Sequence, residues 1–159
     1  GKTLARNVPS NLAYPANAKI VATAKSGLAV TLTSLTPDCT YSSGVFTALK
    51  GEGQCALAFA TAGNATTAAA AGNFPFILVP GDQKVERMTK NLVKGKPMAF
   101  PVETNFGSAI TYKSLTKNCV VELNLAQAKK SGECKIRATA PAKAGMWNAL
   151  NMVYTIPVK

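Results

Sequence analysis

The side chains that most often carry out chemistry are scarce in this sequence of 159 residues. Histidine, the side chain whose ordinary pKa lies nearest neutrality, does not occur at all. Catalytic triads that use histidine and the common catalytic zinc sites therefore cannot be built. The seven carboxylates are isolated among basic or polar neighbours; they are Asp38, Glu52, Asp82, Glu86, Glu103, Glu122 and Glu133. We expect a non-enzymatic chain with no metal and no cofactor.

An internal repeat indicates how the chain is organised. Residues 27–39 align with residues 107–119 at an offset of 80, and residues 53–58 align with residues 132–137 at an offset of 79. The Pro80-Gly81-Asp82 step between the copies is of the kind that ends one element and begins another. We therefore predict two domains, 1–80 and 81–159.

The apolar pattern within the copies has a period of two residues. Cys134, Ile136 and Ala138, for example, alternate with polar residues, as in half-buried strands. Further strands are predicted at 18–24, 45–49, 74–79, 98–103, 119–123 and 152–158. The alanine-rich residues 60–72 have high helix propensity, and we interpret them as an inter-strand loop that could carry a helical turn. The pattern predicts an all-β chain of two small two-sheet sandwiches.

The residues of the first copy resemble those of a known family. Residues 22–37, Cys39, the Lys50-Gly51-Glu52-Gly53-Gln54-Cys55 run and residues 62–65 are similar to the bacterial immunoglobulin-like repeats found in tandem arrays in large exported proteins. The second copy keeps Gly107, Ser114-Leu115-Thr116, both cysteines and Ala144-Gly145, but departs from the pattern at Pro101 and Trp147. The resemblance implies two immunoglobulin-like β-sandwich domains and an extracellular structural role, and it implies no catalytic residues.

The four cysteines allow three pairings. Cys39 and Cys55 occupy places equivalent to those of Cys119 and Cys134, so the repeat favours one disulfide within each copy. Paired cysteines in small β domains are typical of an oxidising compartment. The alternative is four free buried thiols in a cytosolic protein. We expect the disulfides, and with them a protein that is extracellular or on a cell surface.

Positive charge is concentrated in the second copy, which carries +8 of the net charge of +11. Two of its segments are basic: one contains Lys84, Arg87, Lys90, Lys94 and Lys96, and the other Lys129, Lys130, Lys135 and Arg137. These segments would favour contact with an anionic cell-surface polymer. Alternatively, lysines at solvent-facing strand positions protect sheet edges from pairing. Nucleic acid is not an expected partner, because no exposed aromatic residues are interleaved with the basic ones.

The remaining signals bear on partners and location. Trp147, the only tryptophan, is either a contact residue or part of its own sandwich core. Apolar runs are shorter than the roughly 18 residues that a membrane span requires, and the start shows no signal peptide, so we expect a mature chain or a fragment. The sequence therefore predicts a structural or adhesive module that contacts neighbouring copies or domains of a larger assembly. The alternative is a phage virion protein that uses such domains for host attachment.

Overall fold

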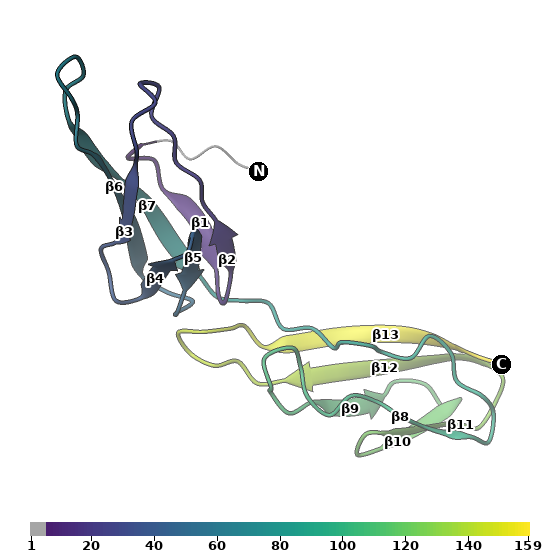
Figure 1. Ribbon diagram of the computed structural model, residues 1–159. Coiled ribbons are helices and arrows are strands. Elements are labelled where there is room, and N and C mark those ends of the chain that lie inside the picture. Colours follow the sequence, from purple (N-terminus) through teal and green to yellow (C-terminus); the bar gives the residue numbers. More distant parts are fainter. Residues whose placement is uncertain (1–5) are drawn as a thin grey trace. The chain divides into compact units, whose positions relative to one another are not determined.

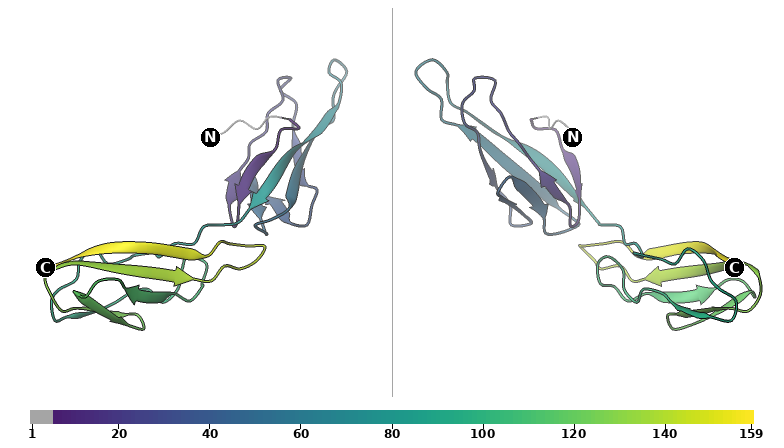
Figure 2. Two further views of the ribbon diagram at one scale, coloured as in Figure 1. Left: turned by 180° about the vertical axis from the view of Figure 1, so that it is seen from behind. Right: turned by 45° about the vertical axis from the view of Figure 1, so that its right-hand side comes forward.

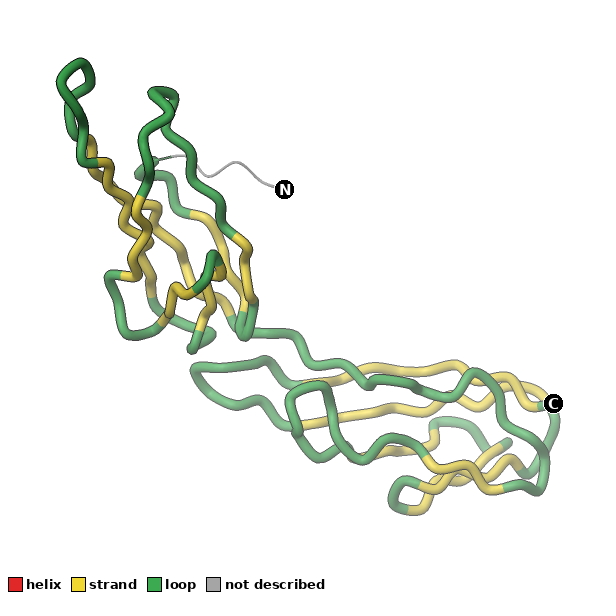
Figure 3. Tube along the Cα trace, in the orientation of Figure 1, coloured by secondary structure: helices red, strands yellow, loops and turns green. Residues whose placement is uncertain are grey.

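The computed structural model describes residues 6–159, and this part of the chain is built from strands and loops with no helix (Figure 3). It follows that the described residues contain no helix that could cross a membrane. The chain divides into two compact units. The first ends at Gly81 and also includes Gly145–Trp147, and the second comprises Asp82–Ala144 and Asn148–Lys159.

The first unit contains two sheets (Figure 1). One has the order β1-β7-β6-β3, with β1 parallel to β7 and the other neighbours antiparallel. The second sheet has the order β2-β5-β4 and is antiparallel throughout. The strands are β1 (Ser10–Ala13), β2 (Asn17–Lys19), β3 (Thr31–Ser34), β4 (Cys39–Ser42), β5 (Val45–Ala48), β6 (Gln54–Thr61) and β7 (Ala70–Val79).

The second unit repeats this strand order. Its sheets are β13-β12-β9 and β10-β11-β8, and all their pairs are antiparallel. The strands are β8 (Pro97–Ala99), β9 (Thr111–Ser114), β10 (Cys119–Glu122), β11 (Leu125–Ala128), β12 (Gly132–Ala140) and β13 (Leu150–Val158). Both views in Figure 2 show β12 and β13 running side by side along the length of the unit. In place of β1, a single parallel bridge joins Leu92 to Val158.

Each unit has its own hydrophobic core. Phe46, Leu57 and Phe76 lie at the centre of the first, and Leu92, Ile136 and Ile156 at the centre of the second. The period-two pattern explains the second core, because Cys134, Ile136 and Ala138 are fully buried while the residues between them face solvent. The predicted all-β fold is confirmed.

One disulfide closes each unit. Cys39 pairs with Cys55 at a Cα–Cα distance of 6.2 Å, and Cys119 pairs with Cys134 at 5.8 Å. Each bridge joins β4 to β6 or β10 to β12, and therefore connects the two sheets of its own unit. The predicted pairing is confirmed. Loops of this length contribute about 3 kcal/mol each to stability in the chain-entropy model.

An inter-strand loop does lie within residues 60–72, between β6 and β7, but the helical turn expected in it is wrong. β6 continues to Thr61 and β7 already begins at Ala70, so most of the alanine-rich stretch belongs to a long hairpin. The side chain of Asn64 turns the chain, because its Oδ1 accepts hydrogen bonds from the amides of Thr66 (3.0 Å) and Thr67 (2.9 Å). Local side-chain capping of this kind competes with helix formation, and pairing between the two strands overrides the propensity of alanine.

Two other predicted strands are shorter than expected. β2 ends at Lys19 rather than continuing to residue 24. Lys19 pairs with Val45, the first residue of its partner β5, so beyond the turn at Gly44 no further residue of β5 is available for pairing. β8 ends at Ala99 rather than at residue 103. Pro101 has no amide hydrogen and cannot donate to a strand ladder, which accounts for the early end of β8.

Candidate functional site

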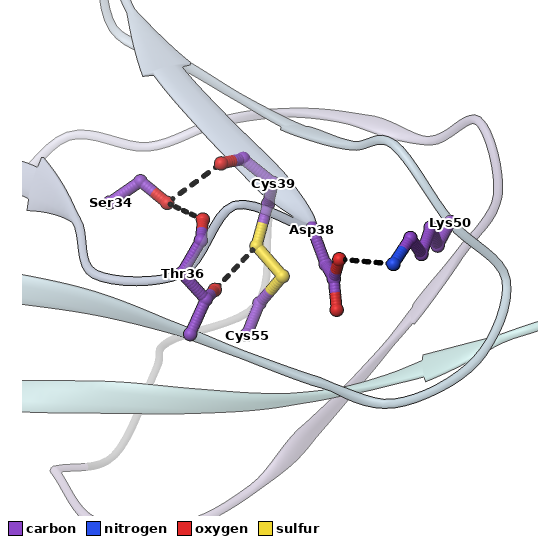
Figure 4. A network of polar contacts seen from close by, with 6 residues as sticks. All are labelled: Ser34, Thr36, Asp38, Cys39, Lys50 and Cys55. Atoms are coloured by element: carbon purple, nitrogen blue, oxygen red, sulfur yellow. Dashed lines mark hydrogen bonds and ion pairs between the residues drawn. A yellow bond between two sulfur atoms is a disulfide. The ribbon is translucent and has the colours of Figure 1, made fainter.

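A network of polar contacts surrounds the disulfide of the first unit (Figure 4). Ser34 Oγ donates to the carbonyl oxygens of Thr36 (3.3 Å) and Cys39 (2.9 Å). Thr36 Oγ1 lies 3.4 Å from the sulfur of Cys39. The hydroxyl of Ser34 therefore satisfies backbone carbonyls of the turn that leads into the disulfide, and the hydroxyl of Thr36 lies beside a bonded sulfur that is not a nucleophile.

The second unit has the same arrangement at equivalent positions. Ser114 Oγ donates to the carbonyl of Thr116 at 2.9 Å and lies 3.4 Å from the sulfur of Cys119. Thr116 Oγ1 lies 3.5 Å from that sulfur. The repeated Ser-Leu-Thr step is thus explained by the geometry of a turn. Its leucines, Leu35 and Leu115, point outward and are 58% and 42% exposed.

An ion pair stabilises the first of these turns. Lys50 Nζ lies 2.7 Å from Asp38 Oδ1, and the hydrogen bond to Asp38 together with its charge raises the pKa of Lys50. In the second unit Asn118 stands at the position of Asp38. Its carbonyl accepts hydrogen bonds from the amides of Lys129 (2.7 Å) and Lys130 (3.2 Å). The turn is preserved, but the neutralising carboxylate is replaced by an amide.

The structure brings part of the two predicted basic segments together. Lys94 and Ala128 form an isolated parallel β-bridge, and the amide of Gly95 donates to the carbonyl of Ala128 at 3.1 Å. Lys94 and Lys96 therefore lie beside the turn that carries Lys129 and Lys130, and all four side chains are exposed. We call this group the basic end.

The other residues of the first basic segment lie outside the basic end. The backbone amide of Lys84 donates to Asn105 Oδ1 at 2.8 Å. The Nζ of Lys84 lies 3.7 Å from Glu86 Oε1. Arg87 is exposed in a turn with a left-handed φ of 56°. Lys90 is also exposed. Lys84 therefore lies beside a carboxylate, and none of these three residues is included in the basic end.

A second cationic group lies on the outer face of the β9-β12-β13 sheet. Lys113 on β9 is directly opposite Arg137 on β12. Lys135 is two residues before Arg137 and therefore projects from the same face. All three side chains are exposed. We call them the sheet-face triad. Sequence reasoning noted Lys135 and Arg137 but missed Lys113, because the pairing register of β9 with β12 is what brings it to them.

A groove of about 1100 Å³ lies within the first unit. One wall is the irregular segment of residues 19–30, and the other carries Phe59, Phe74 and Phe76 from β6 and β7. Lys19 is the one charged residue among the described residues that line it. Its lining mixes apolar side chains with hydroxyl and amide groups, and it brings no set of reactive groups together.

Trp147 lies in the loop between β12 and β13. It is half-buried and is grouped with the first unit. The core of the second unit is formed by other residues, of which Leu150, Ile136 and Phe100 are examples.

A buried polar network that the sequence did not reveal lies in the second unit. Gln83 and Thr104 are 6% and 7% exposed, and Thr104 Oγ1 donates to Gln83 Oε1 at 2.8 Å. Gln83 Nε2 donates to the carbonyls of Pro141 (2.9 Å) and Asn148 (2.7 Å). These bonds attach the segment that begins the unit to the loop between β12 and β13, which is a structural role.

Burial raises the pKa values of two tyrosines in the second unit. Tyr112 is 7% exposed, and its hydroxyl donates to the carbonyl of Pro101 at 2.8 Å. Burial, with a smaller contribution from Tyr154, raises the pKa of Tyr112 to about 12. The pKa of Tyr154 is also raised by burial. A phenol with such a pKa remains protonated at neutral pH, where it can donate a hydrogen bond.

Within residues 6–159 the structure contains no group of three or more histidine, cysteine, aspartate or glutamate side chains that could hold a metal. No protein-family model matches the chain, and no curated protein matches it.

Proposed function

We propose that this chain is an exported, non-enzymatic structural or adhesive module, a spacer or assembly unit of a bacterial cell-surface protein, filament or surface layer. The observation that carries this proposal is that each of two similarly ordered β units has its own disulfide between its two sheets. Such units act by presenting surfaces and by keeping their shape.

The disulfides support a location outside the reducing cytosol. Units of roughly 80 residues have small cores, and covalent cross-links are a common way of stabilising domains of that size outside the cell. Both bridges are buried, since Cys39, Cys55, Cys119 and Cys134 are at most 3% exposed. Together they contribute roughly 6 kcal/mol in the chain-entropy model, which is of the order of the whole stability of a small domain.

The remaining support comes from the sequence. The absence of histidine removes the usual general base at neutral pH, and the Ser-Leu-Thr hydroxyls are used in turns beside the disulfides. The resemblance of the first copy to bacterial immunoglobulin-like repeats agrees with a tandem arrangement. In this proposal the two units are immunoglobulin-like domains that contact neighbouring domains of a larger assembly.

Antibody labelling of the cells that produce the protein tests this proposal. We expect intact cells to be labelled as strongly as permeabilised cells, or the protein to be recovered from the medium or a surface fraction. A cytosolic enzyme marker provides the control for cell integrity. Labelling that requires permeabilisation would show an intracellular protein and would contradict the proposal.

A further inference from the structure

We propose that the sheet-face triad, Lys113, Lys135 and Arg137, is a binding site for an anionic polysaccharide. The proposal relies on the proposed function only in placing the protein where such polymers occur. The triad lies on one face of the second unit and is distinct from the basic end.

The charges of the triad are placed unfavourably for the sheet itself. Lys113 and Arg137 form a directly opposed pair on adjacent antiparallel strands, where side chains are about 5 Å apart and like charges destabilise the sheet. Lys135 adds a third cation about 7 Å along β12. None of the three has an ion pair within the described part of the chain. Glu133 is the acidic residue of β12, and it lies beyond Lys135, farther from the opposed pair.

The first unit has an equivalent sheet without these charges. Thr33 on β3 is opposite Ala58 on β6, just as Lys113 is opposite Arg137. Ala56 stands at the position of Lys135. The fold therefore does not need cations at these places. Protection of a sheet edge could account for Lys113, which lies on the edge strand β9, but it does not account for Lys135 and Arg137, because β12 is the central strand of its sheet.

The rest of this face carries mainly hydroxyl groups. Thr111 and Thr139 project beside the triad, and Thr155 and Val153 lie opposite Lys135 and Arg137 on β13. Hydroxyls donate to and accept from sugar hydroxyls, and the arginine fork binds carboxylates or sulfates with two parallel bonds. The outward positions of β9, β12 and β13 carry no aromatic ring, whereas binding of single-stranded nucleic acid depends on stacking. The cationic, hydroxyl-bearing face fits an extended anionic polysaccharide.

The test uses two variants of the full chain that remove the same amount of charge. The first, Lys113→Thr/Lys135→Ala/Arg137→Ala, gives the second unit the residues that the first unit has. The second, Lys90→Gln/Lys94→Gln/Lys96→Gln, removes three cations from the basic segment. Binding to polygalacturonate is measured at low and physiological salt, and binding to oligothymidylate is measured in parallel. Circular dichroism checks that each variant keeps its β fold.

We expect the wild-type chain to bind polygalacturonate more tightly at low salt, because exposed charges are screened beyond about 8 Å at physiological ionic strength. The first variant should lose about tenfold in affinity, the sum of three exposed charge interactions, and the second should change it by less than about twofold. Adding Thr33→Lys, Ala56→Lys and Ala58→Arg to the first variant should restore binding on the first unit.

Three results would overturn the proposal. Equal losses in the two variants would mean that net charge rather than the triad attracts the polymer. Tighter binding to oligothymidylate would assign the face to nucleic acid. Failure of the wild-type chain to bind polygalacturonate at low salt would remove the site altogether. Each of these results leaves the surface location of the protein untouched, so the site and the proposed function are tested separately.

Discussion

Lys113 and Arg137 face each other across β9 and β12 with the same charge and with no acidic residue paired to either within residues 6–159. Opposed like charges weaken a sheet. We expect Lys113→Thr to raise the free energy of unfolding by about 0.5 kcal/mol at low salt, and to do so less at high salt. Denaturant unfolding at several salt concentrations measures this effect.

Lys96→Thr is the matched control, because Lys96 is exposed outside the sheet face. It should leave the stability almost unchanged. A stability loss on Lys113→Thr that is independent of salt would show that the lysine stem packs on the sheet and that the pair carries no electrostatic cost.

The buried phenol of Tyr112 predicts a pH dependence. Its folded-state pKa is about 12 against roughly 10 in an unfolded chain, so between these values the folded state retains a proton that the unfolded state has lost. The stability contribution is therefore fully present below pH 10 and is lost as the pH rises toward 12. Comparison of wild type with Tyr112→Phe isolates this contribution.

Tyr112→Phe should cost about 1 kcal/mol near neutral pH, because the hydrogen bond to Pro101 is lost. The difference between the two proteins should shrink in denaturant titrations carried out between pH 10 and pH 12. Stability curves that stay parallel across this range would contradict the burial of the phenol.

The turn between β10 and β11 has a strained residue at its tip. Leu123 has a φ of 55° and is 92% exposed, and the left-handed region costs an ordinary residue about 1 kcal/mol or more. Asparagine tolerates this region better. We expect Leu123→Asn to stabilise the protein by about 0.5 kcal/mol.

Leu125→Asn, on the neighbouring strand, is the control, because asparagine is unfavourable within a strand. The two variants should change the thermal midpoint in opposite directions. A lower midpoint for Leu123→Asn would mean that the leucine makes a stabilising contact despite its exposure.

The Gln83–Thr104 network predicts a large effect for one substitution. Gln83→Met removes the acceptor of the Thr104 hydroxyl and the side-chain donor to the carbonyls of Pro141 and Asn148. Buried polar groups without partners cost about 1 to 3 kcal/mol. We expect a loss of about 2 kcal/mol in unfolding free energy.

The same substitution at exposed Gln127 on β11 should change the stability by less than about 0.5 kcal/mol. Equal effects of the two substitutions would show that the network around Gln83 does not contribute to stability.

Much of the fold follows from short-range pattern and from the repeat. The alternation around Ile136 predicts β12, and the equivalent positions of Cys39 and Cys119 predict the disulfide pairing, because both features depend on neighbours in the sequence. The end of β2 at Lys19 and the extension of β7 back to Ala70 were not predictable. Each depends on where a partner strand begins or ends, and no local pattern contains that information.

The candidate site was likewise predictable only in the part that depends on local sequence. Composition locates the positive charge in the second half of the chain, but only the register of β9 against β12 places Lys113 beside Arg137. The buried pair of Gln83 and Thr104 has no sequence signal, because both are ordinary surface residues by type. Their burial results from how the start of the second unit packs onto its own loops.

The proposed function requires that the two β units, each closed by its own disulfide, work in an oxidising environment. Peptide mapping without reduction, on protein recovered from the cells that produce it and alkylated at collection, tests this most directly. We predict peptides that join Cys39 to Cys55 and Cys119 to Cys134, with no alkylated cysteine. Alkylated cysteines throughout, or peptides that join a cysteine of one unit to a cysteine of the other, would contradict the claim.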